Sequence, residues 1–347
     1  MTISILMPVR DAEATLEEAL ASLVGQTHRD WELIAVDDGS RDSSPGILAR
    51  WANKDCRIRM IGQQPLGIVA ALQRAATEAN GDCLARMDAD DVSAPRRLEL
   101  QLARLKSDPK VEVVSCRVET LPSANSSPLQ TTDSGGMSAY LAWLNSLLEH
   151  EAMARERFIE SPLPHPSVLM SRRAYEEIGG YRDQGWPEDY DLWLRMFASG
   201  KRFAKLSETL YFWRDLPGRA SRNKPRYDRG AFLRCKAHHF VRGPLRGNRP
   251  FYQWGAGRYG KSLLRLLIAA NRRPLALVDI DPKKIGHRVP NDASGVPVID
   301  PEALPPAGQA LVAAAVGSRG SDRARREIRQ ALAAKGYVEG VDFWAMT

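Results

Sequence analysis

The sequence CLARMDADD at residues 83–91 places three carboxylates directly behind a short apolar run. Cys83–Met87 has the pattern of a buried strand, and Asp88, Asp90 and Asp91 follow it. Three like charges this close together repel one another unless a cation or hydrogen-bond donors lie among them. Carboxylate oxygens suit Mg²⁺ or Mn²⁺, which proteins often bind through one or two carboxylates and the phosphates of a substrate. A solvated Asp-rich turn is the alternative interpretation, because Asp is common where strands end.

Apolar runs of strand length alternate with segments of helical spacing upstream of this motif. The predicted strands are Ile3–Val9, Trp31–Val36, Arg57–Ile61 and Cys83–Met87, and the predicted helices between them are Ala12–Leu23, Ser43–Trp51 and Ile68–Ala79. Such an alternation predicts parallel βαβ units in an α/β fold. Ligands of these sheets bind at the carboxyl ends of strands, where Asp37 and Asp38 follow the second strand and the acidic cluster follows the fourth. This coincidence favours a binding site over a solvated turn.

The composition is typical of a globular protein that is large enough for two domains. The chain has 347 residues, of which 44% are hydrophobic and 26% charged. It contains no apolar run of about 18 residues, and its first residues lack the basic start and long apolar segment of a secretory signal. The cysteines have no Cys-x-x-Cys spacing, which predicts buried thiols in a reducing, cytoplasmic setting. They are Cys56, Cys83, Cys116 and Cys235.

Four segments of the first 215 residues together resemble a family 2 glycosyltransferase of the GT-A fold. They are ISILMPVRDAEATLEEALASLVGQTHRDWELIAVDDGSRDSS, ARMDADDVSAPRRLELQ, HPSVLMSRRAYEEIGGYRD and WPEDYDLWLRM, in that order. The resemblance implies a nucleotide-sugar-binding sheet with flanking helices over residues 1–215. It also implies inverting transfer of a sugar from a nucleoside-diphosphate donor, with a UDP-sugar favoured, to a saccharide or lipid-linked acceptor. The setting that it implies is bacterial-type polysaccharide, lipopolysaccharide or glycoconjugate synthesis.

The resemblance also implies roles for residues of the acidic motif, together with Mg²⁺ or Mn²⁺ as cofactor. Asp90 would be the direct metal ligand, and Asp88 would contact the ribose, the metal or metal-bound water. A departing diphosphate gains negative charge, which a metal held by this pair can neutralise. Arg86 and Arg97 flank the motif, and each could hold the diphosphate or brace the carboxylates, with bracing favoured for Arg97.

The nucleoside pocket implied by the resemblance involves the first two strands. Asp38, together with Asp37, would accept hydrogen bonds from the base or the ribose. Pro8 and Arg10 would lie at the edge of the base pocket, where relatives often carry an aromatic residue at the Arg10 position. An arginine can also stack its planar guanidinium on a base. Gly67 would let the following helix approach the donor closely.

The acceptor side is predicted to lie at the start of the helix Tyr190–Ala198. Asp189 resembles the family's catalytic base, which takes the proton of the acceptor hydroxyl, and Glu188 would contact the acceptor or the metal shell. Favourable interaction with the helix dipole is the alternative explanation of these two acids. His165 could contact the acceptor or metal, or shape a proline-flanked loop. Trp186 could stack on a sugar or belong to the core or a lid.

A strongly basic segment separates the two predicted domains. Residues 214–249 contain 11 Lys/Arg and 2 Asp, a net charge of +9. A solvated, helical linker over residues 216–248 is the favoured interpretation. Attraction to anionic lipid headgroups, which would place the protein at the inner face of the membrane, or to a phosphate-bearing acceptor is the alternative. Nucleic acid is not an expected partner, because few aromatic residues are interleaved and no binding motif is present.

Residues 249–347 are predicted to form a smaller Rossmann-like α/β domain. The strand Phe251–Trp254 precedes a Gly-x-Gly-x-x-Gly loop, and an acid follows the next strand. The candidate residues of a second nucleotide site are Gly255, Gly257, Gly260 and Asp279. This part resembles the small Rossmann-like domains of bacterial sugar-modifying proteins. Nucleotide or nucleotide-sugar binding and a purely structural role both remain open, whereas NAD redox chemistry is not expected because no Tyr-x-x-x-Lys pair is present.

Two other functional classes fit part of the sequence. A sugar nucleotidyltransferase also uses metal-bound carboxylates on an α/β sheet, but it normally carries a Gly-rich basic first loop, unlike residues 8–12. A non-catalytic nucleotide-sugar-binding protein, acting through the C-terminal domain, would not need both Asp90 and Asp189. The glycosyltransferase interpretation accounts for both acids.

Overall fold

The chain divides by its internal contacts into two compact units. The computed structural model describes residues 1–121, 136–214, 224–290, 295–317 and 321–347. The first unit comprises Met1–Met153 and Pro162–Lys224, and the second comprises Ala154–Ser161 and Pro225–Thr347. None of the described helices has the length and hydropathy needed to cross a membrane.

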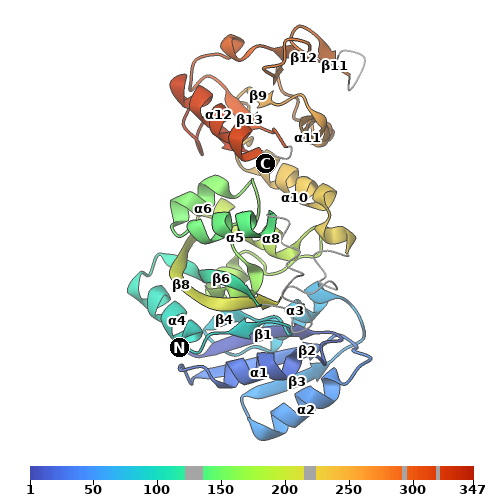
Figure 1. Cartoon of the computed structure of the whole chain (residues 1–347), viewed down its shortest axis with the longest axis vertical. Helices are drawn as coiled ribbons and strands as arrows, with labels where there is room; N and C mark the ends of the chain where they lie inside the picture. Colours follow the sequence, from blue (N-terminus) through green and yellow to red (C-terminus); the bar gives the residue numbers. More distant parts are fainter. Residues whose placement is uncertain (122–135, 215–223, 291–294, 318–320) are drawn as a thin grey trace, which may run out of the picture. The chain divides into compact units, whose positions relative to one another are not determined.

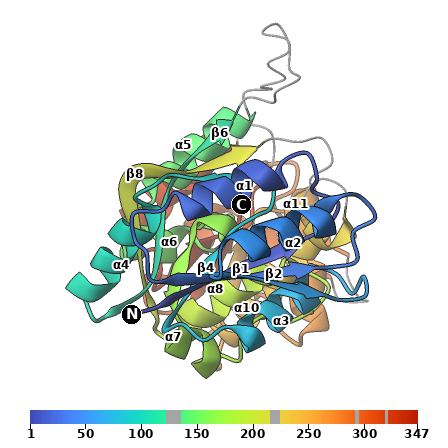
Figure 2. The same cartoon turned by 90° about the horizontal axis from the view of Figure 1, so that it is seen from below.

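The first unit contains an eight-stranded mixed sheet with helices on both faces (Figures 1 and 2). Its strands are β1 (Ile3–Val9), β2 (Trp31–Asp37), β3 (Ile58–Gly62), β4 (Cys83–Arg86), β5 (Val92–Ser93), β6 (Val111–Leu121), β7 (Leu169–Ser171) and β8 (Arg202–Arg214). They lie in the order β3-β2-β1-β4-β7-β6-β8-β5. β1 pairs parallel with β2 and β4, and β2 with β3, which confirms the predicted parallel βαβ arrangement. β7 is antiparallel to both of its neighbours.

The helices of this unit are α1 (Leu16–Val24), α2 (Ser44–Lys54), α3 (Ile68–Glu78), α4 (Arg97–Ser107), α5 (Gly136–Ser146), α7 (Arg172–Glu177) and α8 (Glu188–Ala198). A further helix, α6 (His150–Glu156), begins in this unit and continues into the second.

α1 begins later than the predicted residue Ala12. The amide N of Ala12 donates to the Ser44 Oγ at 2.8 Å, and Asp11 has a φ of 48°, so the chain is not helical there. α5 and α6 are two separate helices. The chain turns after α5, where the Asn145 side chain bonds both the N and the O of Val118 in β6.

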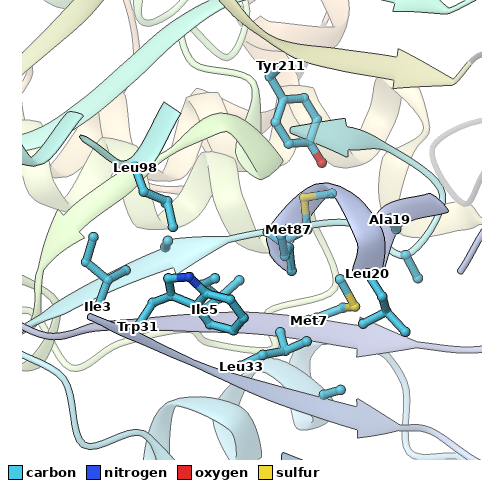
Figure 3. Close-up of a cluster of buried hydrophobic side chains, with 14 of the residues drawn as sticks. Ile3, Ile5, Met7, Ala19, Leu20, Trp31, Leu33, Met87, Leu98 and Tyr211 are labelled. Atoms are coloured by element: carbon cyan, nitrogen blue, oxygen red, sulfur yellow. The ribbon is translucent and has the colours of Figure 1, made fainter. Parts of the chain in front are cut away.

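Alternate residues of β1 pack on opposite faces of the sheet. Ile3, Ile5 and Met7 lie in a buried cluster with side chains of α1, α2 and α4 (Figure 3). Leu6 lies in a second cluster with side chains of α3 and α8. Because both faces are covered, the strand is almost continuously apolar, and polar groups enter only where it ends. The acidic residues therefore gather at the carboxyl ends of β2 and β4.

The second unit contains a six-stranded sheet. Its elements are α10 (Arg229–Arg242), β9 (Phe251–Trp254), α11 (Arg258–Ala269), β10 (Leu277–Val278), β11 (Arg288–Val289), β12 (Val296–Ile299), β13 (Leu311–Ala314), α12 (Ser321–Ala334) and β14 (Phe343–Ala345). The strand order is β11-β12-β10-β9-β13-β14, and all pairs are parallel except β11 with β12. α10 packs against α11 within this unit.

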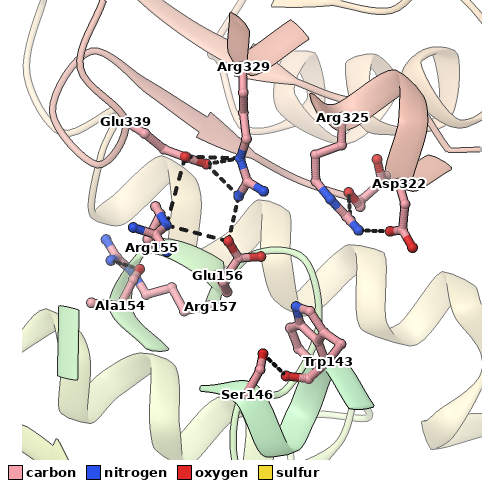
Figure 4. Close-up of polar contacts among 11 residues, drawn as sticks. Trp143, Ser146, Ala154, Arg155, Glu156, Arg157, Asp322, Arg325, Arg329 and Glu339 are labelled. Atoms are coloured by element: carbon pink, nitrogen blue, oxygen red, sulfur yellow. Dashed lines mark hydrogen bonds and ion pairs between the residues drawn. The ribbon is translucent and has the colours of Figure 1, made fainter. Parts of the chain in front are cut away.

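Residues 154–161 are held in the second unit by charge pairs and aromatic packing. Arg329 of α12 binds both carboxylate oxygens of Glu339 and also the Glu156 Oε1, at 2.6 Å (Figure 4). The ring of Phe158 meets that of Phe240 edge-on at 5.3 Å. Glu156 is almost fully buried, so removing Arg329 would leave a buried charge without its main partner. These contacts explain why a short segment leaves the first unit and rejoins it at Pro162.

The cysteines differ in one respect from their prediction. Cys83, Cys116 and Cys235 are buried cysteines outside any disulfide, and burial raises the pKa of Cys116 to about 11. Cys56 is exposed, because it lies in the turn between α2 and β3 rather than inside either element.

Lys205 allows the pH dependence of the first unit's stability to be tested. This buried β8 residue donates from Nζ to the carbonyls of Leu144, at 2.5 Å, and Pro162, at 3.0 Å. Burial lowers its pKa to about 7, whereas an unfolded lysine titrates near 10.4. Between these pH values the unfolded state binds the extra proton, so stability from this group rises as the pH increases from about 7 to about 10.

Lys205→Met is expected to flatten this rise in the free energy of unfolding, measured by urea denaturation across that pH range. Lys110→Met, which changes an exposed lysine of the same unit, is the control. Parallel curves for the wild type and Lys205→Met would contradict the assignment.

Candidate active site

Three carboxylates meet directly after β4. One oxygen each from Asp88, Asp90 and Asp91 lies within 4.8 Å of the others. The loop is fixed by β8, because the Asp88 N donates to the Tyr211 Oη at 3.2 Å and the Arg214 N donates to the Asp91 Oδ1 at 2.8 Å. Asp91 is fully buried, and the other two acids are half-buried. The structure thus adds Asp91 to the two metal-ligand candidates named from the sequence.

This donor set fits a divalent metal. All three groups are hard oxygen ligands, the kind that Mg²⁺ and Mn²⁺ prefer over nitrogen or sulfur. Three carboxylates this close repel one another, and a cation among them would relieve that repulsion beside the Arg86–Asp88 ion pair. We therefore keep Asp88 and Asp90 as candidate ligands, with Asp91 as the third oxygen source or as their support.

Arg86 and Arg97 are buried braces of the acidic loop. Arg86 binds the Asp88 Oδ1 through Nη2 at 2.5 Å, and its Nη1 donates to the carbonyl of Met87. Burial by itself would lower the pKa of Arg86, but Asp88, through its charge and hydrogen bond, acts together with Tyr181 and Tyr211 to raise it overall. Arg97 donates from Nη2 to the carbonyl of Arg86 at 2.6 Å. These contacts support bracing over direct contact with a diphosphate for both arginines.

Asp38, after β2, is occupied by donors of the protein. Its carboxylate accepts from the Gln63 Nε2 at 2.8 Å, from the Leu66 N at 2.8 Å and from the Gly67 N at 2.9 Å. Arg10 approaches the same carboxylate at 3.4 Å. Gly67 has a φ of 94°, and an added Cβ would meet no protein atom within 4 Å. Backbone conformation therefore requires this glycine, and Asp38 organises the loop before α3.

Asp37 is the better-placed member of the pair for contact with a ligand. Its Oδ1 accepts from the Ser40 N at 3.3 Å, and among the described residues its Oδ2 has no hydrogen-bond partner. Val9 lies beside Asp37 in the parallel β1–β2 pairing, and Pro8 lies one position earlier, beside Val36. The Pro8 edge and the Asp37 carboxylate thus occur together at the ends of two adjacent strands.

Substitutions of the two acids are expected to separate binding from folding. In Asp38→Asn, the amide NH₂ would replace one carboxylate oxygen and face the N–H donors that now bind Asp38. The substitution is therefore expected to lower the free energy of unfolding by about 1.5–3 kcal/mol. Asp37→Asn keeps the Ser40 contact, so we expect stability to change by less than about 0.5 kcal/mol and donor affinity to fall about tenfold. Urea denaturation and calorimetric titration with a nucleotide sugar measure the two effects. The opposite pattern would assign ligand contact to Asp38.

The acceptor-side candidates lie around the first turn of α8. Glu188 is buried and Asp189 is half-buried, and Pro187 precedes them at the helix N-cap. The positive end of the helix dipole favours their ionised forms. The indole Nε1 of Trp186 donates to the Asp191 Oδ1 at 3.1 Å, which fixes the ring beside this turn.

His165 and Tyr181 lie beside this turn, and the charge of Arg86 acts on both side chains. The His165 Nε2 lies 2.7 Å from the Tyr181 Oη, and its Nδ1 lies 3.8 Å from the Glu188 Oε1. Burial, with a smaller contribution from Arg86, holds the pKa of His165 well below its usual range, so the ring is neutral at pH 7. Burial raises the pKa of Tyr181, and nearby charges that include Glu188 and Asp189 raise it further. The two halves of the candidate site therefore belong to one electrostatic network.

The glycine loop of the second unit has a packing explanation at two of its three glycines. A Cβ on Gly255, whose φ is 115°, would lie 2.5 Å from the Ala315 carbonyl oxygen. A Cβ on Gly260 would lie 1.9 Å from the Gly255 carbonyl oxygen. Gly257 alone has open space around it.

Asp279 of the second unit also has protein partners. Its carboxylate accepts from the Ala256 N, the Asp281 N and the Lys284 Nζ, each at 3.0 Å. These bonds hold the glycine loop to the end of β10 and use oxygens that a ribose would otherwise bind. A second nucleotide site stays a prediction.

Several contributors to the site have no recognisable local signal in the sequence. Tyr211 and Arg214 reach the acidic loop from β8, more than 100 residues away in the chain. Tyr181 sits in the segment GGYRD, where the glycines indicated only a turn. Its pairing with His165 is visible only in the folded structure.

The first unit is similar in sequence to known glycosyltransferases. Residues 4–179 match the family model described as "Glycosyl transferase family 2". The chain is 34% identical over 214 residues to "Putative glycosyltransferase EpsE" of Bacillus subtilis, covering 60% of this chain and 71% of that protein. It is 26% identical over 202 residues to "Amylovoran biosynthesis glycosyltransferase AmsE" of Erwinia amylovora, covering 58% and 71%.

Solved structures share the fold at low sequence identity. The S. aureus TarS 1–349 structure with UDP-GlcNAc has a TM-score of 0.50 at 15% identity, covering 70% of this chain and 67% of that one. The mannosyltransferase PcManGT from Pyrobaculum calidifontis, with GDP-Man and Mn²⁺, has a TM-score of 0.50 at 19% identity, covering 72% and 65%. The chain spans only 40% of the longer TarS structure.

Proposed function

Because this chain belongs to glycosyl transferase family 2, we propose that it transfers a sugar from a nucleoside-diphosphate sugar to a hydroxyl acceptor, with inversion, in polysaccharide synthesis. The proposal rests on two groups of acids, the three-carboxylate cluster after β4 and the pair at the start of α8, where His165 lies beside Glu188. One group of acids suits a metal and a diphosphate, and the other suits a hydroxyl proton.

The leaving-group side would use the acidic loop. Asp90 and Asp88, supported by Asp91, would hold Mg²⁺ or Mn²⁺, which neutralises charge on the departing diphosphate. Arg86 keeps the Asp88 carboxylate in place from the buried side. The Mn²⁺ in the PcManGT structure is consistent with this choice of metal.

The acceptor side would use Asp189 as the base. Its carboxylate takes the hydroxyl proton while the acceptor oxygen bonds to the anomeric carbon and the bond from that carbon to the diphosphate oxygen breaks. Displacement from the opposite face inverts the anomeric configuration. Glu188 is buried beside His165, which suits a positioning role for the first turn of α8.

The donor is proposed to be a UDP-sugar, because the TarS structures were solved with UDP and UDP-GlcNAc. A GDP-sugar is the second option, from the PcManGT complex. The acceptor is proposed to be a saccharide or a lipid-linked saccharide, because the relative AmsE is named as an amylovoran biosynthesis glycosyltransferase.

A donor panel tests the proposal. The chain is incubated with UDP- and GDP-sugars, with and without Mn²⁺, and both the melting temperature and nucleoside diphosphate release are measured. We expect one donor class to raise the melting temperature and to be hydrolysed only with metal. Binding without release would favour a non-catalytic role, and pyrophosphate-dependent formation of a nucleoside triphosphate would favour a nucleotidyltransferase. NMR of the transferred sugar determines whether the configuration is inverted.

A further inference from the structure

The chain contains a long segment without a single acidic residue. Residues 229–278 include 11 Lys/Arg and no Asp or Glu, whereas the whole chain has a net charge of only +7. The rest of the chain is therefore net negative. All of residues 229–278 are described, and they form α10, β9, α11 and β10 of the second unit.

The positive charges lie on the solvent-exposed sides of two packed helices. α10 buries residues such as Leu233 and Phe240, and α11 buries residues such as Leu263 and Leu267. In α11 the exposed cations recur at the spacing of one helix face. We define the basic face as Arg229, Arg234, Arg242, Arg246, Arg258, Lys261 and Arg265, all exposed. The two helices contact each other (Figure 1).

The cations of the basic face have no ion-pair partner among the described residues. Within the described part of the chain, none of its seven cations forms an ion pair with a carboxylate. Other exposed arginines of the same unit do, such as Arg323 with Glu327 at 2.8 Å. Arg258 and Lys261 also stand in the first turn of α11, at the positive end of the helix dipole, where cations are unfavourable. An anionic partner would relieve both effects.

We propose that the basic face binds the surface of an anionic lipid bilayer. Its cations are spread over two helices and a loop instead of converging on one pocket, which suits an extended charged surface. The exposed positions of α10 and α11 carry no large apolar side chain, so the contact is electrostatic and does not require insertion. The same exposed positions carry no aromatic ring, which disfavours single-stranded nucleic acid, where base stacking contributes strongly.

Vesicle co-sedimentation of the full chain tests the proposal. One set of vesicles is pure phosphatidylcholine, and in the other about a third of the lipid is phosphatidylglycerol. We expect binding only to the anionic vesicles at about 0.1 M salt, and its loss at about 0.5 M salt, where charges are strongly screened. The triple variant Arg234→Glu, Arg258→Glu and Arg265→Glu is expected to bind these vesicles about 100-fold more weakly.

The matched control reverses three exposed cations of the first unit, Arg29→Glu, Lys106→Glu and Lys110→Glu. It has the same net charge as the triple variant and is expected to keep most of the binding. If both variants lost vesicle binding equally, the net charge of the protein would explain the binding, and the proposal would be overturned. Wild-type binding that ignores phosphatidylglycerol, or tighter binding of single-stranded RNA than of anionic vesicles at equal salt, would overturn it as well.

Thermal melting of both variants checks that they fold. Metal-dependent donor hydrolysis is expected to be unchanged in the triple variant, because none of its three positions lies in the candidate active site. Failure of the membrane proposal therefore leaves the transferase proposal untouched, and the reverse also holds.

Discussion

Asp189→Asn is expected to slow sugar transfer by about 10²–10⁴-fold, because the amide cannot accept the proton of the acceptor hydroxyl. Donor affinity is expected to stay within about twofold of the wild type, since the substitution leaves the acidic loop after β4 intact. The rate constant is measured under single-turnover conditions with saturating donor, and donor affinity is measured by calorimetric titration. A large effect on rate alone identifies a group that acts in the transition state.

Asp183→Asn provides the matched control for this substitution. Asp183 is an exposed acid of the same segment, ahead of α8, and the loss of one surface charge is expected to leave the rate unchanged. Equal rates for Asp189→Asn and the wild type would remove Asp189 as the base. Glu188 would then be the next acid to test, by Glu188→Gln.

Asp90→Asn is expected to weaken Mn²⁺ binding and to reduce donor hydrolysis by about 10³-fold. A metal ion at a departing diphosphate contributes several kcal/mol of transition-state stabilisation, and each 1.36 kcal/mol corresponds to a factor of ten in rate. Mn²⁺ affinity is measured by electron paramagnetic resonance of the free ion, which reports binding independently of turnover. Chelation of the wild type with EDTA should reproduce the loss, and added Mn²⁺ should restore activity.

Asp82→Asn is the control for the metal prediction, because Asp82 lies exposed just before the opposite end of β4. It is expected to bind Mn²⁺ as the wild type does. If Asp90→Asn bound Mn²⁺ with wild-type affinity, the cluster would not be the metal site. If it lost the metal but kept full activity, transfer would not depend on that metal.

Much of the first unit could be predicted from local patterns. β1 occupies its predicted range, and α3 begins at its predicted residue, because apolar periodicity directly reflects which faces are buried. The end of α5 could not be predicted in this way. Its sequence continues a helical pattern, but Asn145 bonds to β6 instead, a contact that depends on the folded sheet.

The candidate site shows the same division. Acidic residues at the ends of β2 and β4 were visible because polar groups stand out where buried strands stop. Their individual environments were not visible. Asp37 and Asp38 look equivalent in sequence, yet Asp38 is occupied by the loop before α3 while Asp37 keeps an oxygen without a hydrogen-bond partner among the described residues.

The amino-acid sequence by itself determined the alternation of strands and helices, the family, and the acids at the strand ends. These features depend on residue type and short-range spacing. Tertiary structure alone decided that Arg86 is buried against Asp88, that Tyr211 holds the acidic loop, and that a neutral His165 lies against Tyr181 and Glu188. Such features arise when residues distant in the chain exclude water from one another, and burial then sets their charge states and hydrogen bonds.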